Sequence, residues 1–494
     1  MKQQHWNGAA LGLSLLAVAL TAWVSLRIFE GLPHIEDEFA NLWQAEVMAE
    51  GDIRRPTPAE PKSFIVPFVV DHDGWRFGKY PPGWPALLSL GVRAGAASFV
   101  NPLLAGLACW LTYRLAGRWL RPGLALLAAL LLVTSPMFLM LSGSLMSHNL
   151  SLTLALAFSL AWLDLFSARG RTAAPNWMLG SVIGGSLGLL VLTRPLTAIG
   201  VSLPFMVHGS LLLYRRDSRW RWLLISAGAT LALAGMLLIW QFALTGDAFQ
   251  NPYTLWWEYD RLGFGPDIGT LEGGHNLRQA WINTRFSLRA GLHDAFGWPF
   301  LSWLFLPFGL FVLLPKADAR PVIAIVPLLI LVYGLYWIGS WLFGPRYYYE
   351  ALPALAVISA AGVGWLGAFL KGMKASAWRR LGTTALVAFL LAVNLSFYLP
   401  ARIGGMHGLY GIDRKSLAAI AGADLEQALI IVHADHWSSY ANLLPLRPPF
   451  ADSSLQVAWS RGPGPDERVA DLFPGYDLYL YDSDNPGVLQ RMNK

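Results

Sequence analysis

The segment PHIEDEFANLWQAE, residues 33–46, decides how the sequence is interpreted. It places three carboxylates side by side, Glu36, Asp37 and Glu38, directly after the uncharged run 3–26. A helix needs about 20 apolar residues to cross the hydrocarbon core of a bilayer, so this run is long enough for a membrane span. The sequence therefore predicts a first transmembrane helix that ends beside a cluster of acids.

The whole chain has the composition of a polytopic membrane protein. Of its 494 residues, 55% are hydrophobic and 14% are charged, which is typical of chains that cross a membrane several times. The formal net charge of +6 could indicate a nucleic-acid partner, but the basic residues lie between apolar runs rather than on a soluble domain. We therefore expect membrane lipids and no nucleic acid as partners. The only cysteine, Cys109, lies in an apolar run, so one chain cannot form a disulfide.

Uncharged runs that could cross a membrane recur along the chain. They are 3–26, 94–113, 122–163, 172–193, 195–214, 222–246, 295–315, 321–345, 351–370 and 381–401. The third run is about twice as long as one span needs, and its polar stretch SGSLMSHN, residues 142–149, indicates a break between two helices. The sequence thus predicts a mainly α fold with about 11 transmembrane helices.

Basic residues alternate between successive runs and predict the topology, because loops rich in Lys and Arg face the cytoplasm. The cations assigned to that face are Lys2, Arg114, Arg118, Arg121, Arg169, Arg171, Arg215, Arg216, Arg219, Arg221, Lys316, Arg320, Lys371, Lys374, Arg379 and Arg380. The prediction is a multi-pass protein of the cytoplasmic (inner) membrane with a cytoplasmic N-terminus. Two arginines in short outer loops break the rule: Arg194 in LTRPLT and Arg346 in GPRYYYEALP.

Three longer segments are assigned to the outer face: residues 30–93, 247–294 and 401–494. In the first, DEFANLWQAEVMAEG (37–51) has apolar residues at helical spacing and predicts a helix along the membrane surface. The last contains the strand-like stretches ALIIVHAD, SLQVAW and DLYLYD between turn-forming residues. We therefore predict a transmembrane domain, 1–400, whose first two outer segments form the roof of the site, and a small periplasmic or extracellular α/β domain, 401–494.

The acids and a nearby lysine each have two interpretations. The acids at 36–38 could be a solvated helix start, which the helix dipole favours, or one of them could be a general base where a lipid-borne substrate meets an aqueous one. Lys79, in DGWRFGKYPPGWPALLSLG, could be an interfacial lysine with a buried stem. It could instead bind phosphate, because Pro81 and Pro82 hold it on a stiff approach to the next helix.

Together these features resemble the GT-C glycosyltransferases, above all the protein O-mannosyltransferases and the lipid A aminoarabinose transferases. The resemblance covers residues 1–400 and is carried by the acids after the first span, by KYPPGWP and by the late segment PRYYYEALPALA. It implies a GT-C fold, a polyprenyl phosphate glycoside as sugar donor, and an acid of the first outer segment at the catalytic centre. That acid corresponds to Asp37, with Glu38 beside it.

The same resemblance matches YPP to residues 80–82 and the late Arg-Tyr motif to Arg346 and Tyr347. One departure is Gly83-Trp84, where many relatives carry bulky aliphatic and aromatic residues. This departure leaves the class of acceptor open.

A lipid phosphate would explain the two outer arginines. A phosphodiester in a low-dielectric cleft is an anion that cations bind, and the planar fork of arginine fits phosphate oxygens. We therefore expect the donor phosphate to be bound by Lys79, Arg194, Arg346 and Tyr347, although TRP at 193–195 could simply mark a tight turn. The other active-site candidates are Glu36, Tyr80, His148, Asn149 and Arg285. His148 could equally be an ordinary interfacial residue, and Arg285 with Arg289 could merely cover the surface.

The predicted reaction transfers one sugar, a hexose or a pentose, to a hydroxyl of a glycan, lipid or protein acceptor. Asp37 would take the hydroxyl proton during attack on the anomeric carbon, with inversion, while the cations stabilise the departing phosphate. Crowded acids could also hold a divalent cation, to which Asp71, His72 and Asp73 offer further ligands. This mechanism does not require a metal, so the cofactor stays unknown.

Two other functions stay open. A flippase or transporter of lipid-linked sugars would have similar spans, but transporters place ionisable sites near the middle of the bilayer and often contain internal repeats. Neither feature is found in this sequence. A ligase that uses a pyrophosphate-linked glycan would need the same cations. In the C-terminal domain, His433, Asp435 and His436 could bind metal or simply end a strand.

Overall fold

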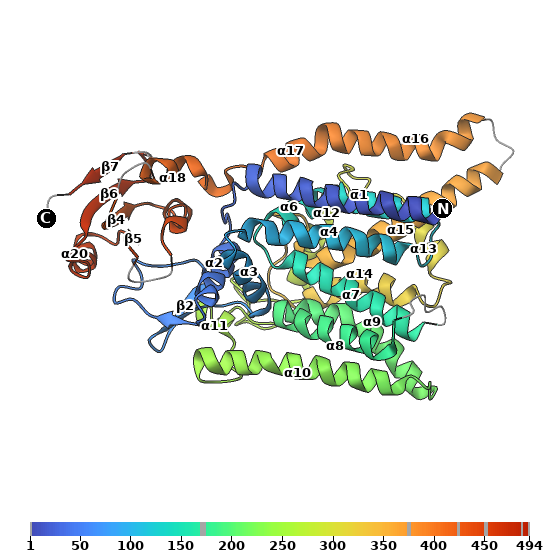
Figure 1. The fold of residues 1–494 in the computed structure, drawn as a ribbon, viewed down its shortest axis with the longest axis horizontal. Helices are drawn as coiled ribbons and strands as arrows, with labels where there is room; N and C mark the ends of the chain where they lie inside the picture. Colours follow the sequence, from blue (N-terminus) through green and yellow to red (C-terminus); the bar gives the residue numbers. More distant parts are fainter. Residues whose placement is uncertain are drawn as a thin grey trace.

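The computed structural model describes residues 2–167, 174–372, 377–421, 425–448, 453–485 and 488–492. Most of its helices run along the longest axis, and the two chain ends lie at opposite ends of that axis (Figure 1). Of the cations assigned to the cytoplasmic face, Arg169, Arg171 and Lys374 lie outside the described residues.

Apolar helices form the bundle at the N-terminal end of the long axis. They are α1 (Lys2–Trp23), α3 (Gly83–Arg93), α4 (Ala97–Ala116), α5 (Pro122–Val133), α6 (Pro136–Gly143), α7 (His148–Phe166), α8 (Asn176–Thr193), α9 (Pro195–Tyr214), α10 (Trp220–Thr245), α13 (Leu306–Leu313), α14 (Arg320–Tyr333), α15 (Leu352–Gly372) and α16 (Ala377–Val393). A π-helical turn, η1 (Val24–Ile28), extends α1, and a second one, η3 (Asn394–Tyr398), links α16 to α17 (Leu399–Gly404).

The described helices include fewer candidate spans than the sequence predicts. Among the described helices, 7 are long and apolar enough to cross a membrane. The number rises to 9 if each of two bent pairs, α3 with α4 and α5 with α6, counts as one span. The predicted break at SGSLMSHN is confirmed, because α6 ends at Gly143 and α7 begins at His148. The count of about 11 is not confirmed. The runs 295–315 and 321–345 contain only the short helices α13 and α14.

The physical reason for the lower count lies in the irregular segments beside α13 and α14. After α14, Gly334, Gly339, Gly344 and Pro345 interrupt the apolar pattern, and the segment between them forms turns and bridges rather than a helix. Irregular backbone within a membrane protein is tolerated where it lines a cavity or is buried in protein. Tyr336 of this segment does line a cavity.

Helices α8 and α10 pack closely because glycines on α8 leave room for α10. A Cβ atom at Gly184 would lie 2.6 Å from Cβ of Ala229 and 2.8 Å from the backbone oxygen of Ser226. At Gly188, a Cβ atom would lie 2.5 Å from Cβ of Leu233. Small residues spaced in this way let two membrane helices approach backbone to backbone.

We expect Gly184→Leu to destabilise the protein, because the new side chain must push α10 away from α8. Overpacking of this kind costs about 1–3 kcal/mol. The measurement is the Tm of the purified full-length protein in detergent. Gly185→Leu is the matched control, since a Cβ atom at Gly185 meets nothing within 4 Å. Equal Tm values for the two variants would contradict this account of the packing.

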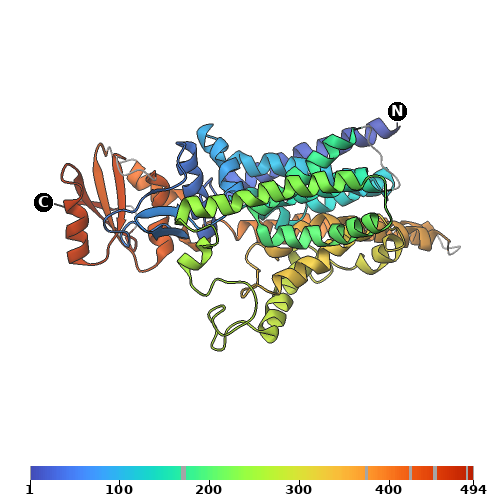
Figure 2. The ribbon, with the colours of Figure 1, turned by 90° about the horizontal axis from the view of Figure 1, so that it is seen from below.

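A set of outer elements covers one end of the bundle. They are α2 (Glu36–Ala49), β1 (Arg55–Pro56), β2 (Val69–His72), β3 (Trp75–Gly78) and α11 (Pro252–Trp256). Helix α12 (Leu277–Asp294) lies along the side of the bundle (Figure 2). The three strands form an antiparallel sheet in the order β1-β3-β2. The helix predicted within 37–51 is confirmed as α2.

The C-terminal part is a small α/β unit, as predicted. Its strands are β4 (Ala428–His433), β5 (Leu455–Trp459), β6 (Asp477–Asp482) and β7 (Leu489–Arg491), and its helices include α18 (Arg414–Ala421), α19 (Trp437–Ala441) and α20 (Pro463–Asp471). The sheet order is β5-β4-β6-β7, and β4 pairs in parallel with both β5 and β6. The three strand-like stretches of the sequence are therefore confirmed as β4, β5 and β6.

The C-terminal sheet packs on the first outer segment. Phe64 is buried in one cluster with Leu429, Ile431 and Ala458, and the backbone N–H of Trp459 donates to the carbonyl of Ser63 over 2.7 Å. Both views show the β2–β3 hairpin between the bundle and the C-terminal sheet (Figures 1 and 2). The C-terminal unit thus shares its core with the outer segment that carries the candidate acids.

Candidate active site

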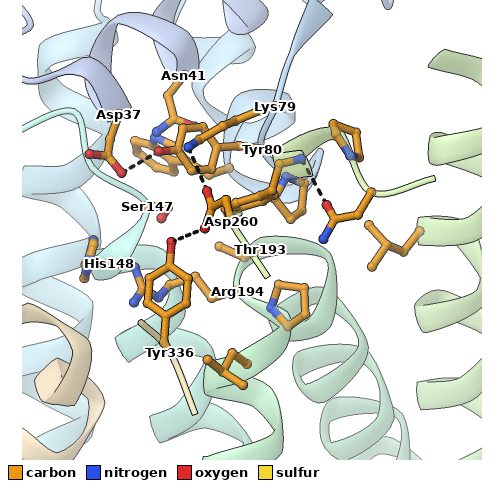
Figure 3. Close-up of a pocket in the computed structure, with 18 of the residues that line it drawn as sticks. Asp37, Asn41, Lys79, Tyr80, Ser147, His148, Thr193, Arg194, Asp260 and Tyr336 are labelled. Carbon is orange, nitrogen blue, oxygen red and sulfur yellow. Dashed lines mark hydrogen bonds and ion pairs between the residues drawn. The ribbon is translucent and has the colours of Figure 1, made fainter. Parts of the chain in front are cut away.

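A cavity of about 290 Å³ lies where the outer elements meet the bundle. Among the predicted site residues, the structure brings Asp37, Lys79, Tyr80, His148, Arg194, Arg346 and Tyr347 together around this cavity. Figure 3 shows several of these side chains converging from separate elements. Asp37 of the first outer segment and the two anomalous arginines therefore share one cleft.

Asp37 is the acid that faces the cavity from the first turn of α2. Its Oδ1 accepts a hydrogen bond of 2.6 Å from the Tyr80 hydroxyl, and its Oδ2 lies 3.7 Å from Nη2 of Arg346. The Asp37 side chain is 20% exposed. Its Oδ2 is therefore the carboxylate oxygen that a substrate in the cavity can reach.

Glu38, predicted as a catalytic neighbour, points into the protein instead. Oε2 accepts from the backbone N–H groups of His34 and Ile35, at 2.9 and 3.3 Å, and Oε1 accepts from that of Leu145 at 2.6 Å. Burial raises the pKa of Glu38 to about 7, whereas these three donors favour its carboxylate. We assign Glu38 a structural role: it joins the start of α2 to the turn before α7 and so fixes Asp37 at the cavity.

Lys79 lies in an aromatic enclosure at the edge of the cavity. Its ammonium is 3.6 Å from the ring centre of Phe68, 4.9 Å from that of Trp257 and 5.0 Å from that of Tyr253. Nζ also lies 3.3 Å from Oδ2 of Asp260, as the dashed line in Figure 3 shows. Lys79 is therefore a buried, paired cation rather than an interfacial lysine that reaches water.

Arg194 stands between the end of α8 and the start of α9, so it marks a tight turn and also faces the cavity. Nη2 donates to the Tyr333 hydroxyl over 2.8 Å, and Nη1 lies 2.6 Å from Nε2 of His148. Because a guanidinium can only donate, Nε2 of His148 accepts, and the ring is neutral in this arrangement. Oε1 of the buried Glu350 lies 3.7 Å from Nε of Arg194 and balances its charge from behind the cavity wall.

Besides Glu38, three predicted candidates do not line the cavity. Asn149 is buried, donates to the carbonyl of Asn101 over 2.6 Å and accepts from the Tyr349 hydroxyl over 3.3 Å, so it ties helices together. Glu36 lies beside the site on α2, where burial raises its pKa. Arg285 is exposed on α12, as is Arg289. Both arginines therefore cover the surface and do not face the cavity.

The departure at Gly83-Trp84 has a packing reason. A Cβ atom at Gly83 would lie 2.6 Å from Oγ1 of Thr193 and 2.8 Å from the carbonyl oxygen of Leu192. Nε1 of Trp84 donates to the carbonyl of Leu145 over 2.8 Å. The start of α3 thus packs directly on the turn that carries Arg194, which leaves no room for a bulky residue at 83.

Sequence reasoning missed Asp260 and the tyrosines that surround the cavity. Asp260, Tyr253, Tyr333 and Tyr336 all line it. The available signal was the density of aromatic residues in YTLWWEYDRLGF, 253–264. That signal does not show which acid of the stretch faces inward. Asp260 does so because its side chain contacts Lys79, which is 181 positions away in the sequence.

The described residues contain no group of three or more His, Cys, Asp or Glu side chains that could hold a metal ion. Asp71 pairs with Arg76, and His72 and Asp73 stand at the hairpin turn away from the cavity. His433 ends β4, and His436 caps α19 by accepting from the backbone N–H of Ser438. This agrees with the interpretation of VHADHW as a strand end.

The charges of the cavity suit an anionic ligand. Three cations, Lys79, Arg194 and Arg346, line it together with two acids, Asp37 and Asp260. A bundle of apolar helices with such a cavity under its outer segments defines a multi-pass membrane protein with a candidate anion-binding site.

Comparison with solved structures identifies the fold. ArnT from Cupriavidus metallidurans bound to undecaprenyl phosphate superposes with a TM-score of 0.57 at 15% identity, covering 97% of this chain and 90% of ArnT. The oligosaccharyltransferase AglB from Archaeoglobus fulgidus, in complex with an inhibitory peptide and a dolichol-phosphate, gives 0.52 at 12% identity, covering 100% of this chain and 74% of AglB. No protein-family model and no curated protein sequence matches this chain.

ArnT and AglB are both GT-C enzymes. The chain therefore has the GT-C fold, as the sequence resemblance predicted.

Proposed function

We propose that the protein is a glycosyltransferase that moves a single sugar, a hexose or a pentose, from a polyprenyl phosphate to a hydroxyl of a glycan, lipid or protein acceptor. The observation that carries the proposal is the contact of Asp37 with Arg346 inside a cavity that is also lined by Lys79 and Arg194. One carboxylate for the acceptor and several cations for the phosphate are the groups that this reaction needs.

The proposed reaction is a direct displacement at the anomeric carbon. The acceptor oxygen forms a bond to that carbon while the bond between carbon and phosphate oxygen breaks, with inversion. The hydroxyl proton passes to Oδ2 of Asp37, and the electron pair leaves with the polyprenyl phosphate. Arg346, Lys79 and Arg194, with the Tyr347 hydroxyl, stabilise the phosphate as its charge increases. These cations supply the charge stabilisation, so the proposed mechanism requires no metal.

We place the reaction on the outer side of the cytoplasmic membrane, with the N-terminus in the cytoplasm and the C-terminal unit outside. The asymmetry of Lys and Arg between the loops supports this orientation. The location of the cavity under the outer segments also supports it, because a lipid headgroup and an aqueous acceptor would meet there. The same location favours an enzyme over a flippase, which would have its ionisable site near the middle of the bilayer.

A panel of radiolabelled donors tests the proposal. The purified full-length protein is incubated with polyprenyl monophosphate sugars and, separately, with a pyrophosphate-linked glycan, each together with a membrane extract that supplies acceptor hydroxyls. Release of the lipid phosphate or pyrophosphate is measured with and without EDTA. We expect one monophosphate sugar to be consumed equally in both conditions. Consumption of only the pyrophosphate-linked glycan would replace the proposal with a ligase, and loss of activity in EDTA would add a metal to the mechanism.

A further inference from the structure

Asp260 lies in the cavity but cannot serve a substrate directly. Oδ1 accepts from the Tyr336 hydroxyl at 2.9 Å and from Nε1 of Trp337 at 3.0 Å, and Oδ2 pairs with Nζ of Lys79 at 3.3 Å. Its side chain is 1% exposed, against 20% for Asp37. Both carboxylate oxygens of Asp260 therefore already have protein partners. Asp260 can affect a ligand in the cavity only through those partners, Lys79 above all.

The surroundings of Lys79 explain why such a partner is needed. The ammonium is buried among Phe68, Trp257 and Tyr253. Aromatic faces attract a cation, but the loss of water disfavours the charged form of a lysine. Burial lowers the pKa of Lys79, and the Asp260 carboxylate acts against this shift.

Other charged groups facing Lys79 cannot replace Asp260 during turnover. Asp37 and Glu36, both on α2, also favour the ammonium, but neither is within ion-pair distance of Nζ. In the proposed reaction Asp37 accepts the acceptor proton and loses its charge. At that moment the phosphate carries its greatest negative charge, and Asp260 is the acid that still contacts Lys79.

We propose that Asp260 is a positioning residue that holds Lys79 charged and in place for the donor phosphate. This inference rests on the proposed function, in which Lys79 binds that phosphate. Asp260 is fixed from the other side by Tyr336 and Trp337, which belong to the irregular segment after α14. The phosphate site is thus assembled from the first outer segment, the second outer segment and the segment 334–345.

The test measures binding of undecaprenyl phosphate to the full-length protein as a function of pH, without turnover. Asp260→Asn keeps the shape of the side chain and removes its charge. At mildly acidic pH, where Lys79 is protonated in both proteins, we expect the affinities to be similar. As pH rises, the affinity of Asp260→Asn should fall at a pH that is lower than in the wild type by about one unit or more. The reason is that an adjacent opposite charge shifts a pKa by about 1–3 units.

Two further variants separate this role from a structural one. Tyr336→Phe removes a hydrogen bond from Asp260 but no charge. Any loss of affinity in this variant should therefore be equal at every pH, and the pH at which binding falls off should stay the same. Lys79→Arg in the Asp260→Asn background should return affinity at alkaline pH, because a guanidinium does not titrate there. An equal loss of affinity at every pH in Asp260→Asn would overturn the inference.

Failure of the inference can be distinguished from failure of the proposed function. If the wild type binds no undecaprenyl phosphate at any pH, the proposed donor class is wrong. If the wild type binds and the alkaline limb of Asp260→Asn does not move, the role of Asp260 alone is wrong. If Asp260→Asn does not fold, Lys79→Arg is made in the otherwise wild-type protein. In that variant the affinity for undecaprenyl phosphate should fall only at a higher pH than in the wild type, and an unchanged pH would overturn the inference.

Discussion

Asp37→Asn is expected to bind the donor and to turn it over on the order of 10²–10⁴ times more slowly than the wild type, the range that general base catalysis supplies. The amide has nearly the shape of the carboxylate and can still accept from Tyr80, so the cavity should persist. It cannot take a proton from an acceptor hydroxyl. The measurement is single-turnover release of polyprenyl phosphate, with donor binding measured in parallel.

Donor binding gives this prediction a second readout. In the wild type, Oδ2 of Asp37 lies 3.7 Å from Nη2 of Arg346, so in the proposed complex its charge would repel the donor phosphate. Removing the charge should leave donor affinity unchanged or raise it, while the rate falls. Asp73→Asn is the matched control, because Asp73 is an 82% exposed aspartate of the same outer segment. An undiminished rate in Asp37→Asn would show that Asp37 is not the base.

The sequence was sufficient to predict the bundle because each apolar run carries its own signal. The lengths of the uncharged apolar runs predicted most of the membrane helices, and the polar stretch SGSLMSHN predicted the turn between α6 and α7. The same signal failed at 295–315 and 321–345, where the apolar residues belong to short helices and irregular backbone. There the backbone groups form hydrogen bonds with neighbouring segments rather than within one continuous helix.

For the site, the sequence predicted the residues whose charge conflicts with their surroundings. Arg194 and Arg346 are cations in outer loops and stood out on charge alone, whereas Asp37 is one of three adjacent acids and was chosen through the resemblance to the GT-C enzymes. The sequence could not distinguish Asp37 from Glu38, which are neighbours on α2 but point to different sides. The sequence could not predict Asp260 as a site residue for a different reason. Its role depends on contacts with Lys79 and Tyr336, which are distant in the chain.

Arg346→Gln is expected to weaken binding of the donor by about 10- to 100-fold, because a hydrogen bond to a charged group contributes about 1.5–3 kcal/mol. Arg346 opens the 3₁₀ turn η2 (Arg346–Ala351), which places its guanidinium in the cavity opposite Asp37. Arg346→Lys keeps the charge but not the planar fork, so it should lose less affinity than Arg346→Gln. The measurement is binding of undecaprenyl phosphate.

The contact with Asp37 raises an alternative for Arg346, namely that it only holds the base in position. Asp37→Asn removes that partner, so the effect of Arg346→Gln is best measured in the Asp37→Asn background. If Arg346 binds phosphate, the loss of affinity persists there. If it only orients Asp37, the second substitution changes nothing. Arg285→Gln serves as the control, because Arg285 is an exposed arginine of α12 that lies outside the cavity.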